Sequence, residues 1–286
     1  GAKTASATEI AGSVDIFVHI QPPTAEEVGS LKNGSIVVST LNARANATDV
    51  ASLASAGATA LAMELVPRIA RAQRMDVLSS QASIAGYKAA LLAANSLGKY
   101  LPMMMTAAGT IPPAKILVLG AGVAGLQAIA TARRLGAIVE AFDVRAAAGE
   151  QVESLGAKFI QPPTAEDAEG AGGYARAQTE EEQAAQREFL KGHIADADAV
   201  ITTAAIPGRP APLLMTEDMV DVMKPGSVVI DLAAESGGNV AGTVAGEIIN
   251  KNGVMINGPI NVPSSMPFHA SQLYSRNVMA LLDLII

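Results

Sequence analysis

A glycine-rich turn between an apolar strand and a helix constrains the fold more than any other feature of the sequence. The apolar run 115–119 leads directly into Gly120, Gly122 and Gly125, spaced as G-x-G-x-x-G, and a helical stretch follows. In this pattern the first glycine permits a tight turn, the second lets phosphate oxygens approach the backbone, and the third lets the helix pack closely. The spacing therefore predicts a β-α-β unit that holds a pyrophosphate at the helix N-terminus.

The next expected strand, at 138–142, ends at Asp143. A carboxylate at this place accepts hydrogen bonds from the adenosine ribose hydroxyls, and its charge repels a 2′-phosphate, so Asp143 favours NAD over NADP. Arg145 keeps the second possibility open, because an arginine nearby can accept that phosphate. We give Asp143 more weight, since it lies directly at the strand end.

Short apolar runs alternate with helical stretches along the chain, which is typical of α/β folds with parallel sheets. A doubly wound, six-stranded parallel sheet is predicted for a second domain at 99–264. A first α/β domain is expected from 1–98 with a returning helix in 265–286, and the prolines of 102–113 suggest an irregular hinge. The six strands expected in the second domain are 115–119, 137–142, 157–160, 199–203, 227–232 and 254–257.

Composition narrows the function classes. Half of the residues are hydrophobic, but only 3% are aromatic and none is Trp, which suits a core of aliphatic side chains around a parallel sheet. A net charge of −7 disfavours nucleic acid as a partner. The absence of Cys excludes disulfides and thiolate chemistry, and no metal site is predicted. No apolar run reaches the roughly 20 residues that span a bilayer. The first residue is Gly1 rather than Met, so a fragment is expected.

The segment 67–81 is dense in polar groups and leads into a long helix expected at 76–97. Composition alone favours a solvated loop in which Asp76 or Ser79 caps that helix. From the residue types by themselves, no chemistry can be assigned to this loop.

Long stretches of the chain resemble the NAD(H)-binding component of proton-translocating NAD(P) transhydrogenases, in the alanine dehydrogenase/transhydrogenase family. The resemblance covers essentially the whole sequence, except that the family's first strand-helix region is expected to be missing. It implies two Rossmann-like domains with NAD(H) in the cleft between them. The stretches that carry it are 62–81, 102–110, 120–125, 143–145, 172–174 and 225–231.

The resemblance also implies roles for individual residues. Arg68, Gln73, Asp76 and Ser79 correspond to a catalytic loop beside the nicotinamide, in which Gln73 aims the ring. Arg68 and Asp76 would hydrogen-bond the carboxamide, the ribose or each other. The implied cofactor-binding residues are Gln73, Arg74, Met75, Asp76, Gly120, Gly122, Val123, Gly125, Asp143, Val144, Arg145, Gly173, Tyr174, Gln186 and Ala205.

The segment 172–186 has two interpretations. Its run of glutamates favours a solvated surface helix. The resemblance instead implies a mobile lid that closes over the nucleotide, with Gly173 at the hinge and Tyr174 near the tip. We favour the lid, on the resemblance and not on composition. Val123 would then pack at the phosphate turn, and Ala205 would line the adenine pocket.

The implied reaction is direct hydride transfer between NAD(H) and NADP(H), of the Si/Re-specific, proton-translocating type. No proton moves at the reacting carbons, so the chain has to position a ring and needs no general acid or base. His19, His193 and His269, the only histidines, lie outside the polar loop. The implied partners are a second copy of the chain, an NADP(H)-binding component and a membrane-spanning proton-conducting component. They would hold the chain peripherally at the cytoplasmic face of a bacterial inner membrane, or at the mitochondrial matrix face.

Three other functions compete with this interpretation. An alanine dehydrogenase-like amino-acid dehydrogenase shares the architecture, but in that family a histidine follows the strand that matches 35–39, where this chain has Thr40 and Leu41. A non-catalytic NAD-sensing module needs only the glycine turn and Asp143, and leaves the polar loop unexplained. A saccharopine-type dehydrogenase shares the fold but requires a different substrate cleft.

Overall fold

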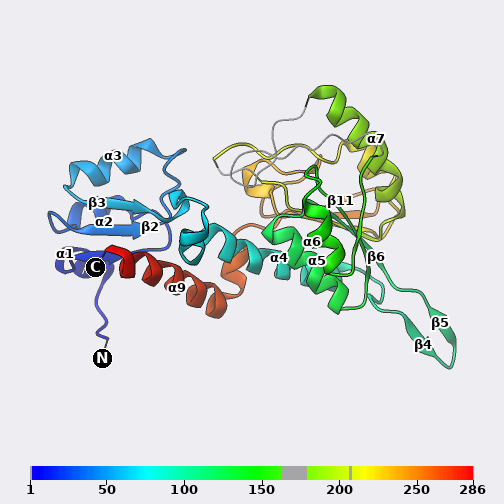
Figure 1. The fold of residues 1–286 in the computed structure, drawn as a ribbon, viewed down its shortest axis with the longest axis horizontal. Coiled ribbons are helices and arrows are strands. Elements are labelled where there is room, and N and C mark those ends of the chain that lie inside the picture. Colours follow the sequence, from blue (N-terminus) through cyan, green and yellow to red (C-terminus); the bar gives the residue numbers. More distant parts are fainter. Residues whose placement is uncertain (1, 163–178, 206–207, 286) are drawn as a thin grey trace. The chain divides into compact units, whose positions relative to one another are not determined.

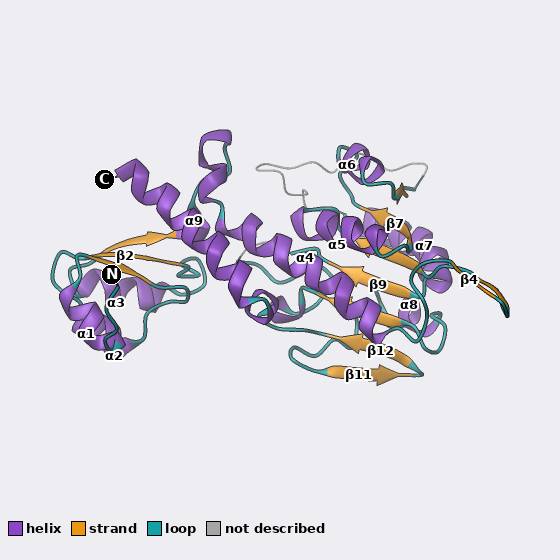
Figure 2. Cartoon of the chain, turned by 90° about the horizontal axis from the view of Figure 1, so that it is seen from below, coloured by secondary structure: helices purple, strands orange, loops and turns teal. Residues whose placement is uncertain are grey.

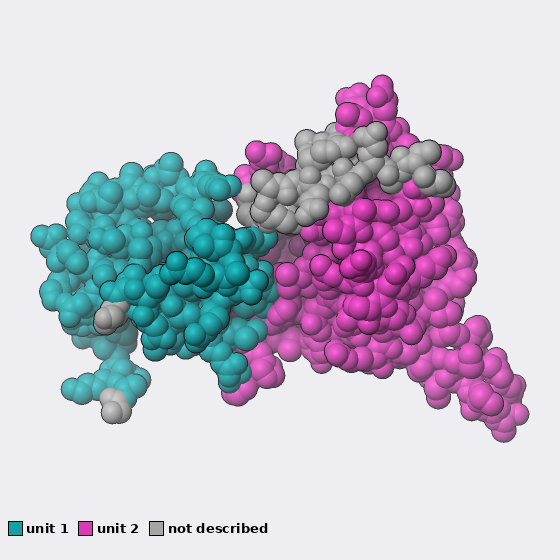
Figure 3. Space-filling model, viewed as in Figure 1, with its two compact units in different colours: residues 1–80, 271–286 teal, residues 81–270 magenta. Residues whose placement is uncertain are grey.

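The computed structural model describes residues 2–162, 179–205 and 208–285. The chain forms two compact units: unit 1 is Gly1–Ser80 with Ser271–Ile286, and unit 2 is Gln81–Ala270 (Figure 3). The chain passes from one unit to the other inside two helices, α4 (Val77–Ser96) and α9 (Pro267–Ile285). The sequence predicts domain limits at 98/99 and 264/265, near one end of each helix, whereas the two units divide at 80/81 and 270/271. A continuous helical pattern gives no sign of a boundary inside it.

Unit 1 is built on a three-stranded parallel sheet in the order β1-β2-β3. Neighbouring residues of β2 face opposite sides, as strand geometry requires. Val37 packs in one cluster with Leu53 of α3, and Val38 packs in another with Tyr274 and Val278 of α9. Figure 2 shows α1, α2 and α3 on one side of this sheet and α9 on the other. The elements are α1 (Ala7–Ser13), β1 (Ile16–Val18), α2 (Ala25–Ser30), β2 (Ile36–Ser39), α3 (Ala47–Ser55), β3 (Thr59–Ala62), η1 (Met63–Leu65) and η2 (Ala70–Met75).

Unit 2 contains a seven-stranded sheet in the order β11-β12-β10-β9-β6-β7-β8. Six strands run parallel, at the places predicted from the sequence, so the doubly wound parallel sheet is confirmed. The strand order reverses between β6 and β9, and ligands of such sheets bind at the carboxyl ends of the strands at this switch point. The parallel strands are β6 (Lys115–Leu119), β7 (Ile138–Phe142), β8 (Lys158–Phe159), β9 (Ala199–Thr202), β10 (Val228–Asp231) and β12 (Val254–Asn257).

Helices cover both faces of this sheet. Consecutive residues of β6 face opposite sides of the sheet. Ile116 packs in one cluster with Ile129 of α5, and Leu117 packs in another with Leu190 of α7. Both faces of a parallel sheet are therefore dry, which explains its continuous apolar runs. Unit 2 also contains the helices α5 (Val123–Arg134), α6 (Ala148–Ser154), α7 (Glu180–Asp196), α8 (Glu217–Asp221), η4 (Ala234–Ser236) and η5 (Val262–Ser265).

A seventh strand, β11 (Ile248–Lys251), pairs antiparallel with β12 and was not expected from the sequence. It is joined to β12 by Asn252 and Gly253, both of which have positive φ. An Asn-Gly pair of this kind is a strong signal for a two-residue hairpin turn. The edge strand could therefore have been found from its turn, although its own apolar pattern is short.

The segment expected to be an irregular hinge is a hairpin instead. The strands β4 (Met104–Thr106) and β5 (Gly109–Ile111) pair antiparallel. Figure 1 shows this hairpin extending away from the large sheet of unit 2. Met105 is 80% exposed, so the hairpin presents apolar surface to solvent. Two three-residue strands are too short for a period of two residues to stand out in the sequence.

In the part of the chain that the structure describes, no helix combines the length and the apolar character needed to cross a membrane.

Candidate functional site

The glycine turn of unit 2 has the geometry predicted from its spacing. Gly120 has a φ of +99°, and a Cβ there would lie 2.6 Å from Oγ1 of Thr203. A Cβ at Gly125 would overlap the carbonyl oxygen of Gly120, so α5 can approach β6 only without a side chain at this position. A Cβ at Gly122, in contrast, would meet nothing within 4 Å among the described residues. A side chain would therefore clash at Gly120 and Gly125 but has space at Gly122, the glycine that faces the ligand in this motif.

Helix α5 begins at this open glycine. Gly122 is its N-cap, and no side chain caps it among the described residues. The first N–H groups of a helix have no intrahelical partner, and the positive end of the helix dipole lies there. Val123, the first helical residue, is exposed. These features fit a bound pyrophosphate.

Asp143 lies directly after β7 and is buried, with 7% of its surface exposed. Its Oδ2 accepts a hydrogen bond from the N–H of Ala121 at 2.7 Å, which ties the carboxylate to the glycine turn. Its Oδ1 accepts one from the N–H of Arg145 at 2.9 Å. The Arg145 side chain binds both oxygens, from Nε to Oδ1 and from Nη2 to Oδ2, each at 2.9 Å. Four donors therefore use the roughly four acceptor sites of this carboxylate.

The loop after β9 forms the other side of the switch point. Oγ1 of Thr203 donates to the carbonyl oxygen of Gly120 at 3.0 Å, which joins the two loops. The side chain of Asn239 holds the same loop: its Oδ1 accepts from the N–H of Ala204 at 3.0 Å, and its Nδ2 donates to the carbonyl oxygens of Ala204 and Pro212, both at 2.8 Å. Ala205, the predicted adenine-pocket residue, is the exposed residue that follows.

A second buried carboxylate supports that asparagine. Asp231, at the end of β10, is fully buried and accepts hydrogen bonds from the N–H of Asn239 at 2.8 Å and from the hydroxyls of Thr202 and Thr243 at 2.9 and 2.8 Å. These polar contacts replace the water that Asp231 loses on burial. Sequence reasoning missed Asp231 and Asn239, although an Asp at the end of an apolar strand, six residues before a Gly-Gly pair, was an available signal.

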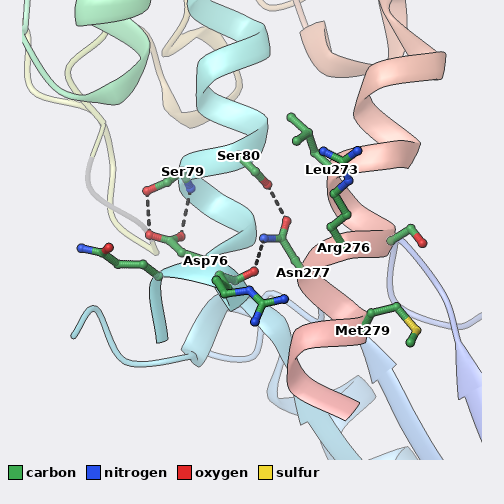
Figure 4. A pocket seen from close by; sticks show the side chains of 10 residues that line it. Asp76, Ser79, Ser80, Leu273, Arg276, Asn277 and Met279 are labelled. Atoms are coloured by element: carbon green, nitrogen blue, oxygen red, sulfur yellow. Dashed lines mark hydrogen bonds between the residues drawn. The ribbon is translucent and has the colours of Figure 1, made fainter. Parts of the chain in front are cut away.

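The polar loop of unit 1 brings Arg68, Asp76 and Ser79 together, and Figure 4 shows Asp76 beside Ser79. Asp76 lies just before the first residue of α4 and accepts from the N–H of Ser79 at 2.9 Å and from its Oγ at 2.6 Å. Nε of Arg68 lies 3.7 Å from Oδ2 of Asp76. Asp76 thus caps the N-terminus of α4 and also forms a partly buried ion pair with Arg68. Gln73 and Arg74 are exposed beside it.

The same loop borders a pocket of about 550 Å³ that also takes residues from α9. Asn277 of α9 is buried and binds the loop at two points, the carbonyl oxygen of Arg74 and the hydroxyl of Ser80. None of these α9 residues was predicted, because almost 200 residues separate them from the loop. The pocket is lined by Gln73, Arg74, Asp76, Ser79, Ser80, Leu273, Ser275, Arg276, Asn277 and Met279.

Some predicted residues lie elsewhere. Met75 is buried in a cluster with Ala72 and Ala280 and does not line the pocket, and Val144 packs against the core of unit 2. Gln186 lies inside α7 and is buried, and its Oε1 has no hydrogen-bond partner among the described residues. Gly173 and Tyr174 fall outside the described residues.

Comparisons with known proteins agree on a family. The description "Alanine dehydrogenase/PNT, C-terminal domain" matches residues 89–285, and "Alanine dehydrogenase/PNT, N-terminal domain" matches residues 1–85. An NAD(P) transhydrogenase subunit alpha of Rhodospirillum rubrum is 51% identical over 99% of this chain and 76% of its own length. The crystal structure of transhydrogenase from Sinorhizobium meliloti covers this whole chain and 78% of its own, with 48% identity and a TM-score of 0.89. Alanine dehydrogenase of Mycobacterium tuberculosis is 30% identical over 83% of this chain and 59% of its own length. The resemblance seen in the sequence is confirmed, and the chain belongs to the alanine dehydrogenase/PNT family.

Proposed function

We propose that the chain is the NAD(H)-binding component of a proton-translocating NAD(P) transhydrogenase. The observation that carries the proposal is the 51% identity to a transhydrogenase alpha subunit across 99% of the chain, against 30% to an alanine dehydrogenase. The glycine turn, Asp143 and the Arg68–Asp76–Ser79 group are the parts of the structure that this function would use.

NAD(H) is the proposed cofactor. The first N–H groups of α5 and the open side of Gly122 would hold the pyrophosphate, between Gly120 and Gly125. Asp143 would accept hydrogen bonds from the ribose hydroxyls after one of the N–H groups that now donate to it has moved away. We propose that the Arg145 side chain is the donor that moves, because the other two donors are backbone N–H groups.

The proposed chemistry is positioning. Bound NAD(H) supplies a hydride at C4 of its nicotinamide ring, and the acceptor is NADP⁺ on a partner component. The Arg68–Asp76–Ser79 group would orient the carboxamide and ribose, and the exposed Gln73 would lie against the ring. Orientation of two reactants can lower a barrier by about 7–11 kcal/mol, so the loop can be catalytic without acting as a general acid or base.

The proposed partners are a second copy of this chain, an NADP(H)-binding component and a membrane-spanning proton-conducting component. The β4–β5 hairpin, with its exposed Met105 and Ile111, is a candidate surface for the second copy. We also propose that Gly173 and Tyr174 belong to a lid over the nucleotide. A peripheral place on the membrane, at its cytoplasmic or matrix face, follows from these partners.

Alanine oxidation has less support. An amino-acid dehydrogenase needs a proton acceptor near its substrate. After β2 this chain has Thr40 and Leu41, and the N–H of Leu41 is bound by Oε2 of Glu64 at 3.0 Å. The histidine of the related dehydrogenases is absent from this stretch.

The test combines the protein with an NADP(H)-binding component, an NADH analogue that carries deuterium at C4, and unlabelled NADP⁺. Direct appearance of deuterium in the NADPH supports the proposal. Robust alanine-dependent NADH formation by the protein alone, without deuterium transfer in the mixture, contradicts it.

A further inference from the structure

One side chain of the C-terminal helix binds the polar loop at two points. Asn277 of α9 is only 6% exposed. Its Nδ2 donates to the carbonyl oxygen of Arg74 at 2.8 Å, and its Oδ1 accepts from Oγ of Ser80 at 2.6 Å (Figure 4). Both polar atoms of the amide are therefore used, one on the end of η2 and one on the first turn of α4.

The hydrogen bond to Arg74 is made near the end of η2, the 3₁₀ part of the loop. η2 is a six-residue 3₁₀ helix, and the hydrogen bonds of a 3₁₀ helix have poorer geometry than those of an α-helix. Its N-cap residue is Ile69, whose side chain cannot accept a hydrogen bond. Gln73 and Asp76 lie on either side of Arg74 and Met75, and the N–H of Asp76 bonds the carbonyl oxygen of Gln73 at 3.3 Å. A shift of the Arg74 carbonyl would change the direction of both side chains.

The attachment of α9 to unit 1 does not depend on Asn277. Tyr274 and Val278 of the same helix pack in the apolar cluster with Val38, and the Tyr274 hydroxyl donates to the carbonyl oxygen of His19 at 2.6 Å. Ala280 packs against Met75. The loss of one buried amide therefore leaves the helix in place and removes the bond that orients the loop.

We propose that Asn277 is a positioning residue for hydride transfer, which sets the direction of Gln73 and Asp76 through the backbone of Arg74. The inference rests on the proposed function, because it assumes that these two side chains aim the nicotinamide. Asn277 itself is buried and acts only through the loop.

The experiment uses Asn277→Ala in the full chain with an NADP(H)-binding component. We expect the single-turnover rate of hydride transfer to fall by about 10- to 100-fold, because small misplacements of reactants have effects of this size. The Kd for NADH, measured by fluorescence with the chain alone, should change less than about threefold, because the proposed phosphate and ribose contacts lie in unit 2. Hydrogen exchange of the amides in 73–79 should become faster without added nucleotide.

Three further variants separate positioning from packing. Ser80→Ala removes the bond between Asn277 and α4 but keeps the bond to Arg74, so its transfer rate should stay within about threefold of the unmodified protein. Asn277→Asp keeps an acceptor for Ser80 but turns a carboxylate toward the Arg74 carbonyl, so it should be at least as slow as Asn277→Ala. Asn95→Ala, at an exposed position near the other end of α4, controls for loss of an asparagine from a helix.

Each outcome decides a different question. Absence of transfer in the unmodified protein overturns the proposed function. Normal transfer or unchanged hydrogen exchange in Asn277→Ala overturns the positioning role alone. An equal loss in Ser80→Ala also overturns it, since that variant keeps the bond to Arg74.

Discussion

Arg145 binds Asp143 through both carboxylate oxygens, and both nitrogen–oxygen distances are 2.9 Å. The carboxylate expected to recognise a ribose is therefore saturated by its own neighbour and by two backbone N–H groups. The same pair bears on the choice between NAD and NADP. While Asp143 holds the guanidinium, the charge of Arg145 is paired with this carboxylate.

Asp143→Asn should weaken NADH binding and release Arg145. A hydrogen bond to a charged group contributes about 1.5–3 kcal/mol, so the Kd for NADH should rise about tenfold or more. The ratio of NADPH to NADH affinity should rise as well, because a freed arginine can pair with the 2′-phosphate. Fluorescence titration with both nucleotides measures this. In the double variant with Arg145→Ala the gain for NADPH should disappear; a gain that persists shows that Arg145 is not its source.

Gly122→Ala and Gly125→Ala should separate ligand binding from folding. A Cβ at Gly125 would overlap the Gly120 carbonyl oxygen, so α5 has to shift, and a loss of about 1–3 kcal/mol of stability is expected. A Cβ at Gly122 points into open space, so the thermal midpoint should hardly change while NADH binding weakens. Calorimetry and nucleotide titration on both variants provide the check. Equal destabilisation by both changes contradicts this geometry.

Asp76→Asn should affect catalysis more than stability. Asn and Asp are about equally good N-caps, so α4 should keep its cap, whereas Asp76→Ala should cost about 1 kcal/mol. The charge pair with Arg68 is lost in both variants, and hydride transfer should fall in both. Urea unfolding and single-turnover rates distinguish the two effects. If Asp76→Asn transfers hydride at the normal rate, the charge has no role in the reaction.

The stability of unit 1 should decrease at high pH because of Tyr274. Burial, and to a lesser degree the charge of Glu64, raises the pKa of Tyr274 to about 12. An unfolded tyrosine loses its proton near pH 10, so this stabilising contribution is complete below pH 10 and is lost as the pH rises from about 10 to 12. Urea unfolding at pH 9 and pH 11 should show the decrease. Tyr274→Phe should reduce it, and Tyr100→Phe, at an exposed position, should leave it unchanged.

The dinucleotide half of the site could be predicted from local sequence. Gly120, Gly122, Gly125 and Asp143 lie within one β-α-β unit, where a short chain segment sets the geometry of the turn. The central parallel strands were equally accessible, because strands such as β9 and β10 are buried along their whole length and are mostly apolar. Elements with short or polar patterns, such as β11 and the β4–β5 hairpin, gave a weaker signal.

Tertiary structure alone decided what surrounds these local motifs. Asn277 reaches Arg74 across 203 positions of sequence, and Asn239 reaches Ala204 across 35, so no local pattern relates either asparagine to its loop. The pairing of Asp143 with Arg145 is close in sequence, but two side chains near one another can pair or point apart, and only the packed backbone determines which. The sequence by itself therefore determined the type of nucleotide site and the class of fold. The folded chain determined which buried polar groups hold the site in place, because hydrogen bonds depend on distance and direction in space.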